Sequence, residues 1–387
     1  MTNLKKEKIE ASFMLASYFE TLGFKNSLWE FNYDNNINSL TKYSLMWNIM
    51  IHHYLILGGA NKINIKGWNS SDDTILIISI IKSILDGGGE QNYKQNFINS
   101  YDILYENKRA SGINTLRSIQ ILKTGKKINI NSDMGGNGAA LRTGPIGIYW
   151  YNNIEKVIEE SIISSLLTHN YYIGFLGGMV TAIFTSYAFN NINPIFWIEK
   201  LLDLYKNKII HKYYPKNHNI EDLDEYMIYW NKYYETRMPK LIYKNTLDSF
   251  IYPEERTLYL LNFYPDKNIK NLILSNTNLK DLNWRWDLIA STGLDVCIYT
   301  YDCLLLSMYT PNNINLDYNN IKYNFDTFLT LVAIHPGDND TTGAIGGAWF
   351  GALNGYHDFD KSRIKELEFF NELKKLSKKF YNKLKKK

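Results

Sequence analysis

Cysteine is scarce in this chain: its 387 residues include only two, Cys297 and Cys303. Two cysteines are too few for a disulfide scaffold. Because both lie in an apolar run, we expect them to be buried free thiols. No collagen-like repeat occurs either, so a fibrous protein of that class is excluded.

Long hydrophobic runs are missing as well. The longest, Ile75–Ile81, is far shorter than the ~18–20 residues that a helix needs to span a bilayer. The opening residues MTNLKKEKIE carry charge but lack the apolar segment of a signal peptide. We therefore expect a soluble, intracellular (cytoplasmic) protein with no membrane partner.

A strong excess of charge of either sign is also absent. The 43 Lys and Arg residues against 39 Asp and Glu leave a net charge of +4, and 45% of the residues are hydrophobic, which excludes a disordered chain. The one charge cluster is a lysine-rich helix expected within 361–387. Its lysines suit the solvated end of an amphipathic helix, and a contact with nucleic acid or an anionic membrane is the alternative. Because the net charge is small and no basic motif occurs, we expect no nucleic-acid partner.

Helical periodicity, by contrast, runs through most of the chain. Residues 4–23 place Ile9 and Phe13 on one side and end at a glycine, which is typical of an amphipathic helix, and 74–85 is typical of a buried one. Alternation with period two is rare, and 127–131 is the best short candidate for a strand. We therefore predict an all-α fold, a compact multi-helix bundle. Further helices are predicted at 39–57, 154–168, 173–189, 195–208, 222–235, 296–308, 324–334, 341–355 and 361–384.

The length allows either one large domain or two smaller ones, since single cores usually stop growing near ~250–300 residues. The segment 210–285 is more polar than its surroundings, but no linker rich in Pro, Ser or Gly marks its edges. We predict a single domain over 1–387, with 210–285 as a lineage-specific elaboration, and a monomer. A separate small domain at 210–285 is the alternative.

Two short oxygen-rich loops each lead into an apolar helix. The first contains Asp72 and Asp73, and the second contains Asp338 and Asp340. Capping of the helix N-terminus is the simpler interpretation of each loop, but one oxygen-bearing residue is enough for a cap. Paired carboxylates repel unless a cation lies between them, and oxygen ligands without His or Cys favour Mg²⁺, Mn²⁺ or Ca²⁺ over zinc. If the fold brings the two loops together, they predict a two-metal site.

A third segment, 132–145, is rich in glycine (SDMGGNGAALRTGP). Glycines let a backbone approach a ligand closely and expose N–H groups to phosphate, and a plain tight turn is the alternative. The segment lacks the ending of a P-loop, and no clear strand precedes it as a Rossmann fingerprint requires. Within it, Asp133 is either a candidate general base or a solvent-exposed loop carboxylate.

Together these segments resemble the ADP-ribosylglycohydrolases in order and spacing, over nearly the whole chain. The pieces that carry the resemblance are SDDT at 71–74, NGAALR at 137–142, TH at 168–169 and GDNDTT at 337–342. Three further pieces resemble the arginine-specific branch: LWEF at 28–31, the segment from LGG at 176–178 to FTSYA at 184–188, and WFGALNGY at 349–356. The resemblance implies an all-α fold with two Mg²⁺ ions (Mn²⁺ as a possible substitute) at the base of a cleft. There the ions hold the distal ribose of ADP-ribose while its bond to a modified side chain, most simply arginine, is hydrolysed.

The resemblance also implies roles for individual residues. The positions that match metal ligands are Ser71, Asp72, Asp73, Asp338, Asp340 and Thr341. The positions that match substrate contacts are Glu20, Gly136, Asn137, Gly138, His169 and Asp295. Asp72 and Asp73 are also the candidates for accepting the proton of the attacking water. The implied partner is an ADP-ribosylated protein or an ADP-ribose-containing small molecule.

A few positions depart from the family pattern. Glu20 replaces an aspartate, no proline follows Thr168 and His169, and Leu294 stands where the arginine branch has histidine. Three functions remain open: an active hydrolase, a catalytically silent relative that binds ADP-ribose or is structural, and a helical nucleic-acid-binding protein with a lysine-rich tail. All four loop aspartates are present, which favours the hydrolase.

Overall fold

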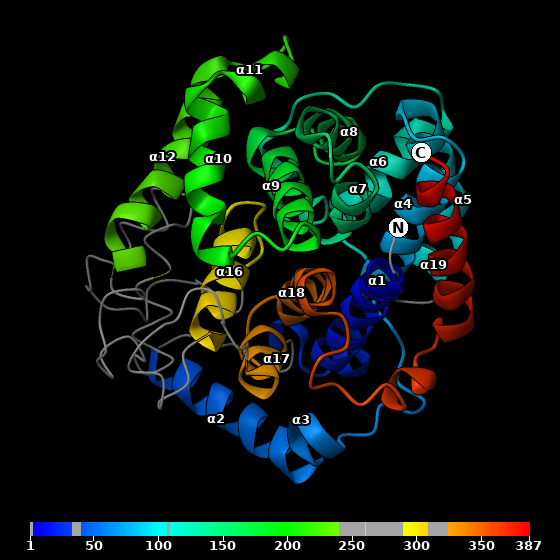
Figure 1. Cartoon of the computed structure of the whole chain (residues 1–387), viewed down its shortest axis with the longest axis vertical. Coiled ribbons are helices and arrows are strands. Elements are labelled where there is room, and N and C mark those ends of the chain that lie inside the picture. The colour runs from blue at the N-terminus through cyan, green and yellow to red at the C-terminus, as the bar shows by residue number, and fades with distance from the viewer. Residues whose placement is uncertain (1–2, 33–39, 107–108, 240–259, 261–288, 309–323) are drawn as a thin grey trace.

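A computed structural model describes residues 3–32, 40–106, 109–239, 260, 289–308 and 324–387 (Figure 1). Within these ranges every regular element is a helix, and the one isolated β-bridge joins Gly136 to Thr292. Residues 127–131 have no partner strand and form a loop. The prediction of an all-α fold is confirmed.

The helices are labelled in chain order as in Figure 1. The α-helices are α1 (Asn3–Phe24), α2 (Leu40–Ile56), α3 (Gly59–Lys62), α4 (Asp72–Leu85), α5 (Glu90–Glu106), α6 (Ile113–Lys123), α7 (Gly144–Tyr149), α8 (Ile154–Leu166), α9 (Tyr172–Phe189), α10 (Trp197–Lys206), α11 (Ile209–Tyr213), α12 (Ile220–Thr236), α16 (Asp295–Ser307), α17 (Phe325–Ala333), α18 (Asn339–Asn354) and α19 (Phe370–Lys385). The 3₁₀ helices are η1 (Lys25–Ser27), η2 (Glu30–Asn32), η3 (Ser132–Met134), η4 (Ala140–Arg142), η5 (Pro194–Phe196) and η8 (Arg363–Glu366).

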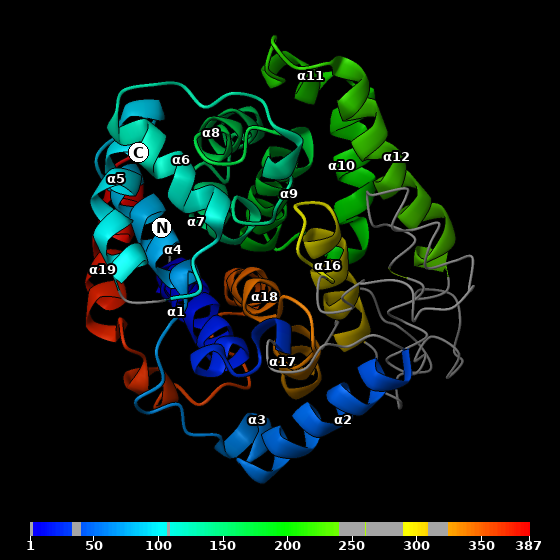
Figure 2. The same cartoon turned by 180° about the vertical axis from the view of Figure 1, so that it is seen from behind.

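Helices α1 and α18 lie side by side at the centre of the molecule, as Figures 1 and 2 both show. Glycines of α18 allow the contact: a Cβ at Gly347 would lie 2.2 Å from the carbonyl oxygen of Leu15, and a Cβ at Gly351 would lie 2.4 Å from the backbone nitrogen of Ser12. The two backbones therefore touch without intervening side chains. This contact fixes the ends of α1 and α18 relative to each other, and α4 packs against both helices.

Helix α9 is the most apolar element of the core. It is the only helix in the described ranges long and apolar enough to cross a membrane, but all of its side chains are buried inside the protein. It packs against α7, α8 and α18, and Gly147 of α7 lies so close that a Cβ there would be 2.1 Å from the carbonyl oxygen of Ala182. Helix α9 is thus accounted for as a helix of the core.

Most predicted helices are present within a few residues of their expected ends, but the C-terminal one begins late. The sequence predicts a helix over 361–384, whereas α19 starts at Phe370. Residues 363–366 form the 3₁₀ helix η8 instead, and the backbone leaves the helical region at Leu367 (φ −62°, ψ 136°). The guanidinium of Arg363 donates to the carbonyl oxygens of Ala60 and Ile63, which holds η8 against the α3 region. Helices α5 and α6 were not predicted, although their buried apolar residues recur at helical spacing.

Parts of two further predictions can be placed. Cys297 and Cys303 are buried free thiols, as expected. Of the segment 210–285, helix α12 packs against α9 and α10, and the ring of its buried Trp230 lies 5.5 Å from that of Phe184. Residues 240–259 and 261–288 lie outside the described ranges, so the division of the chain into domains stays a prediction.

Candidate active site

The two acidic loops meet near the C-terminal end of α1. Asp72 and Asp73 form the first turn of α4, Asp340 lies in the first turn of α18, and Asp338 is the N-cap residue of α18. Near the end of α1, Gly23 lies against the backbone at the start of α18, where a Cβ would be 2.6 Å from a carbonyl oxygen. The packing of α1 with α4 and α18 therefore brings together segments that are far apart in the sequence.

Capping accounts for only part of the oxygen in these loops. Ser71 is the N-cap residue of α4, and its Oγ accepts a hydrogen bond from the N–H of Asp73 at 3.3 Å. Asp340 Oδ1 accepts a hydrogen bond from the N–H of Thr341 at 2.8 Å, whereas the side chain of Asp338 makes no capping bond. Helix capping thus does not explain why so many carboxylates are gathered here.

The carboxyl groups of the two loops lie close enough to raise one another's pKa. Burial raises the pKa of Asp72 to about 7, and Asp338 adds to the shift. The pKa of Asp73 is raised well above its ordinary value, first by burial and then by the charge of Asp72. Burial is also the largest cause at Asp340, followed by Glu30 and Asp73. Like charges in a shared buried site oppose ionisation, so these upward shifts follow from the convergence of the two loops.

Glu30 is a fifth carboxylate of this cluster. It begins the 3₁₀ helix η2, which is tied to the second loop because the N–H of Phe31 donates to the carbonyl oxygen of Gly337 at 3.1 Å. Burial and then the neighbouring aspartates raise its pKa. In the sequence Glu30 is part of the LWEF piece of the family resemblance, but no role was assigned to it. Its position between Trp29 and Phe31 could have identified it as a site residue, because a carboxylate in an apolar run is seldom buried without a partner.

Three oxygens of the cluster are buried without a hydrogen-bond partner: Glu30 Oε2, Asp73 Oδ2 and Asp338 Oδ1. Leaving such an atom unsatisfied costs about 1–3 kcal/mol, and more when it is charged. A divalent cation that prefers oxygen, such as Mg²⁺, fits this donor set, which contains neither His nor Cys. In the part of the chain that the structure describes, no three His, Cys, Asp or Glu side chains already form a group spaced to hold a metal ion. The fit therefore rests on donor chemistry and on the unpartnered oxygens.

Glu20 lies directly behind the first loop. Its Oε1 accepts hydrogen bonds from the N–H and, at 2.7 Å, from the Oγ of Ser71. Its Oε2 accepts from the hydroxyls of Thr21 and Thr74 at 2.9 and 3.2 Å. The side chain is fully buried, and this burial raises the pKa of Glu20 to about 7. Both oxygens thus hold the loop in place, and a contact of Glu20 with substrate stays a prediction.

The glycine-rich loop reaches the acidic cluster through Asn137. The Nδ2 of this residue donates to Asp338 Oδ2 at 2.8 Å and to the carbonyl oxygen of Ala290 at 2.7 Å. Next to it, Gly136 forms the antiparallel bridge with Thr292. The loop that resembles a diphosphate and ribose contact is therefore joined directly to a predicted metal ligand.

Asp295 shapes the segment that pairs with this loop. Its Oδ2 accepts from the N–H of Ala290 at 2.6 Å, and its Oδ1 accepts from the N–H of Thr292 at 2.8 Å. Burial raises the pKa of Asp295 to about 7. Both of its oxygens are used within this segment, so Asp295 orients the partner of the glycine loop, and its contact with substrate stays a prediction.

His169 lies against the other side of the glycine loop. A Cβ at Gly138 would come within 2.9 Å of His169 Nε2, so the ring packs directly on the loop backbone. The ring is 3% exposed, and burial, together with the charge of Arg142, lowers the pKa of His169 to about 3. A neutral imidazole is therefore part of this site at neutral pH.

Asp133 does not join the cluster. It lies in the 3₁₀ helix η3, and its side chain is exposed. Of the two interpretations open from the sequence, the structure supports the solvent-exposed loop carboxylate.

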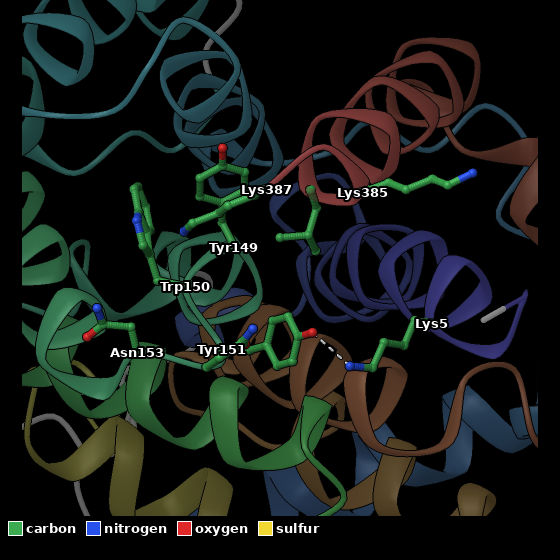
Figure 3. A pocket seen from close by; sticks show the side chains of 9 residues that line it. Lys5, Tyr149, Trp150, Tyr151, Asn153, Lys385 and Lys387 are labelled. Atoms are coloured by element: carbon green, nitrogen blue, oxygen red, sulfur yellow. Dashed lines mark hydrogen bonds between the residues drawn. The ribbon is translucent and has the colours of Figure 1, made fainter. Parts of the chain in front are cut away.

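A separate surface cavity of about 500 Å³ lies between α7, α19 and the start of α1, and contains none of these residues (Figure 3). Two of the three lysines that line it pack on aromatic rings. Lys5 Nζ lies 4.0 Å from the ring centre of Tyr151 and donates to its hydroxyl at 2.8 Å, and Lys387 Nζ lies 4.6 Å from the ring centre of Tyr149. Part of the C-terminal lysine cluster is thus accounted for by packing within the chain.

Comparisons with known proteins identify the family and the fold. Residues 21–387 match the family model described as ADP-ribosylglycohydrolase. The chain is 29% identical to the ADP-ribosylhydrolase ARH1 of Dictyostelium discoideum, over 99% of this chain and 95% of that protein. A solved structure titled ADP-ribosylglycohydrolase-related protein complex covers 98% of this chain and 99% of its own, with a TM-score of 0.51. At 13% identity, that last likeness concerns the fold alone.

Proposed function

The chain belongs to the ADP-ribosylglycohydrolase family, and on that premise we propose that it is an Mg²⁺-dependent hydrolase of ADP-ribosylated proteins. As a member of the family it is a glycohydrolase enzyme that removes ADP-ribose. The proposal adds a site for two metal ions and the modified side chain. Arginine is the favoured linkage, because LWEF at 28–31 and WFGALNGY at 349–356 resemble the arginine-specific branch.

The observation that carries the proposal is the set of unpartnered carboxylate oxygens on η2, α4 and the N-cap of α18. The residues that would hold the ions are Ser71, Asp72, Asp73, Asp338, Asp340 and Thr341, with Glu30 beside them. When bound there, Mg²⁺ would supply positive charge and Lewis acidity at the hydroxyls of the ribose. The carboxylates in turn offset the charge of the ions within a buried site.

Hydrolysis also needs a group that accepts the proton of the attacking water. We assign this role to Asp73, because its Oδ2 is buried within the cluster and has no hydrogen-bond partner. Asp72 is the second candidate: burial raises its pKa to about 7, and the charge of the buried Arg142 guanidinium offsets part of that rise. A general base must lie within hydrogen-bond reach of the proton it takes, so this assignment requires the attacking water to lie beside Asp73 Oδ2.

The glycine-rich loop would orient the remainder of the substrate. Gly136, Asn137 and Gly138 match the family positions that meet the diphosphate and ribose. The amide of Asn137 is held by Asp338 and Ala290, so its orientation is set before a ligand binds. Preorganisation of this kind reduces the entropy lost on binding.

The test is hydrolysis of defined substrates by the purified chain. Proteins ADP-ribosylated on arginine or on serine would be incubated with Mg²⁺, with Mn²⁺ and with a chelator, and released ADP-ribose would be measured. We expect release from arginine-linked substrate that requires the metal. Release that is unchanged by the chelator would contradict the metal site, and release from serine alone would contradict the arginine assignment. Binding of ADP-ribose without any turnover would show a catalytically silent relative.

A further inference from the structure

A chain of buried hydrogen bonds runs from Arg142 to His169. Arg142 Nη2 donates to Thr168 Oγ1 at 2.7 Å, and Thr168 Oγ1 lies 2.8 Å from His169 Nδ1. Arg142 Nη1 donates to the carbonyl oxygen of Gly138 at 2.7 Å. Arg142 and Thr168 are fully buried and His169 is 3% exposed, so water does not compete for these bonds.

The direction of the bonds decides which ring nitrogen carries the proton. A guanidinium has donors and no acceptor, so the Thr168 hydroxyl accepts from Arg142. The hydroxyl keeps its own hydrogen for donation, and His169 Nδ1 is the acceptor that the structure offers it. A nitrogen of a neutral imidazole that accepts a hydrogen bond carries no hydrogen, so the hydrogen lies on Nε2.

The position of the ring then decides where this Nε2–H lies. A Cβ at Gly138 would be 2.9 Å from His169 Nε2, a Cβ at Gly136 would be 3.6 Å from it, and a Cβ at Gly174 would be 2.9 Å from His169 Cβ. The ring is therefore wedged among glycines, with Nε2 under the loop that meets the acidic cluster. Among the described residues, no side chain or carbonyl group accepts a hydrogen bond from Nε2.

We propose that Arg142 and Thr168 are positioning residues that hold His169 as the neutral Nε2–H tautomer, so that it donates to an oxygen of the bound ADP-ribosyl group. The identity of the ligand rests on the proposed function, whereas the tautomer does not. Diphosphate and ribose oxygens accept hydrogen bonds, and a ring with the opposite tautomer would present a lone pair to them. The chain of hydrogen bonds from Arg142 through Thr168 to His169, which we call the relay, thus makes this side of the site selective for a ligand atom that accepts a hydrogen bond.

The tautomer can be measured by nuclear magnetic resonance on the full chain with ¹⁵N-labelled histidine, because the shifts of the two ring nitrogens differ between tautomers. The spectrum of His169→Gln identifies the signals of His169 among the seven histidines. Thr168→Val removes the hydroxyl and keeps the shape, and Thr168→Ser restores the hydroxyl. Thr185→Val is the matched control, because Thr185 Oγ1 is equally buried but donates to the carbonyl oxygen of Thr181 within α9.

We expect the Nε2–H tautomer at pH 7 in the wild type, in Thr168→Ser and in Thr185→Val, and loss of that single tautomer in Thr168→Val. The Kd for ADP-ribose should rise by about 10- to 100-fold in Thr168→Val, as for a lost hydrogen bond to a charged group, and return in Thr168→Ser. An Nδ1–H or a protonated ring in the wild type, or an unchanged tautomer in Thr168→Val, would overturn the relay. A wild type with the expected tautomer that binds no ADP-ribose would overturn the ligand assignment and, with it, the proposed function.

Discussion

Asp340 is the residue whose substitution tests the acidic cluster most directly. Its carboxylate is buried among Glu30, Asp73 and Asp338, and all three raise its pKa after burial. Asp340→Asn keeps the size of the side chain and removes one negative charge. We expect the rate of ADP-ribose release to fall by about 100-fold or more, the scale on which a preorganised electrostatic contribution acts.

Folding of Asp340→Asn should be preserved, because the remaining carboxylates lose a source of mutual repulsion. Urea unfolding would check that its free energy of unfolding is no lower than that of the wild type. Asp133→Asn is the control, since it makes the same chemical change at an exposed carboxylate outside the cluster. Equal loss of activity in both variants would argue against a specific role for Asp340.

His169 predicts a pH dependence of stability. Burial lowers its pKa from 6.5 to about 3, so the folded state excludes a proton that the unfolded chain binds below pH 6.5. The contribution of the neutral His169 to the free energy of unfolding is complete above pH 6.5. It is lost as the pH falls toward 3, with a slope of up to about 1.4 kcal/mol per pH unit. Between pH 6.5 and 5 the wild type should therefore lose about 2 kcal/mol more stability than His169→Gln.

Urea unfolding of both proteins at several pH values would measure this difference. His357→Gln is the control, because His357 is 68% exposed and no buried ring is lost. If His169→Gln and the wild type lose stability in parallel below pH 6.5, the imidazole is not held neutral in the folded state.

At the scale of elements, the contact between α1 and α18 predicts a strong effect of a single methyl group. A Cβ at Gly347 would lie 2.2 Å from the carbonyl oxygen of Leu15, a distance that only a backbone shift can relieve. Gly347→Ala should lower the free energy of unfolding by roughly 1–3 kcal/mol through overpacking. It should also lower activity, because this contact positions α18, whose first turn carries Asp340. Gly346→Ala should cost less, since its nearest neighbours, at 3.1–3.3 Å, are atoms of the Phe328 and Val332 side chains. Denaturant unfolding would measure the free energy of unfolding of both variants. An equal loss in Gly347→Ala and Gly346→Ala would contradict the role of the backbone contact.

Glu368, in the segment before α19, is part of a contact that we expect to affect activity although it lies outside the acidic cluster. The guanidinium of Arg109 donates to both carboxylate oxygens of Glu368, at 2.7 and 2.6 Å. It also donates to the carbonyl oxygen of Ser70 at 2.7 Å. The carbonyl oxygen of Arg109 accepts a hydrogen bond from the N–H of Asp72 at 3.2 Å. The N–H of Ser70 donates to Glu368 as well, so this pair clamps the loop that precedes α4. Arg109→Ala should lower kcat/KM by about 10- to 100-fold, because hydrogen bonds to a charged group contribute about 1.5–3 kcal/mol.

The clamp acts on the loop, so Arg109→Ala should also raise the Mg²⁺ concentration needed for half-maximal activity. Lys82→Ala is the control, because Lys82 of α4 makes an exposed ion pair with Glu372 of α19, and such pairs contribute little. The Mg²⁺ concentration for half-maximal activity would be measured by titration in both variants, and we expect it to rise in Arg109→Ala alone. An unchanged Mg²⁺ response in Arg109→Ala would show that the clamp does not position the acidic loop.

At the scale of the whole molecule, the site joins η2, α4 and α18, so a ligand that binds there must stabilise the chain as a unit. A ligand that binds only the folded state adds about 2.7 kcal/mol at a concentration of 100 Kd. We expect Tm to rise on addition of Mg²⁺ with ADP-ribose, and the rise to be much smaller in Asp340→Asn. A thermal-shift assay with Mg²⁺, ADP-ribose, or both checks this, and an equal rise in the two proteins would place the ligand elsewhere.

Much of the fold follows from the sequence, because helix periodicity and glycine stops are local properties. The expected ends of α1, α4, α9 and α16 agree with the structure to within about two residues, the usual margin of such boundaries. The C-terminal helix was predicted too long, because the backbone turns out of the helical region at Leu367 and the contacts of the preceding residues, such as those of Arg363 with residues 60 and 63, are tertiary. The two acidic loops were recognisable for a similar local reason, since each holds more carboxylate than a cap requires.

The composition of the candidate site, by contrast, was decided only in part by the sequence. The aspartates, the glycine loop and the family resemblance are visible in the chain as written. Only the tertiary structure shows that Glu30 joins the cluster, that Glu20 braces the first loop, and that Arg142 reaches His169 through Thr168. The physical reason is that a hydrogen bond or a repulsion between charges depends on distance in space, and the close packing of α1 against α18 sets those distances.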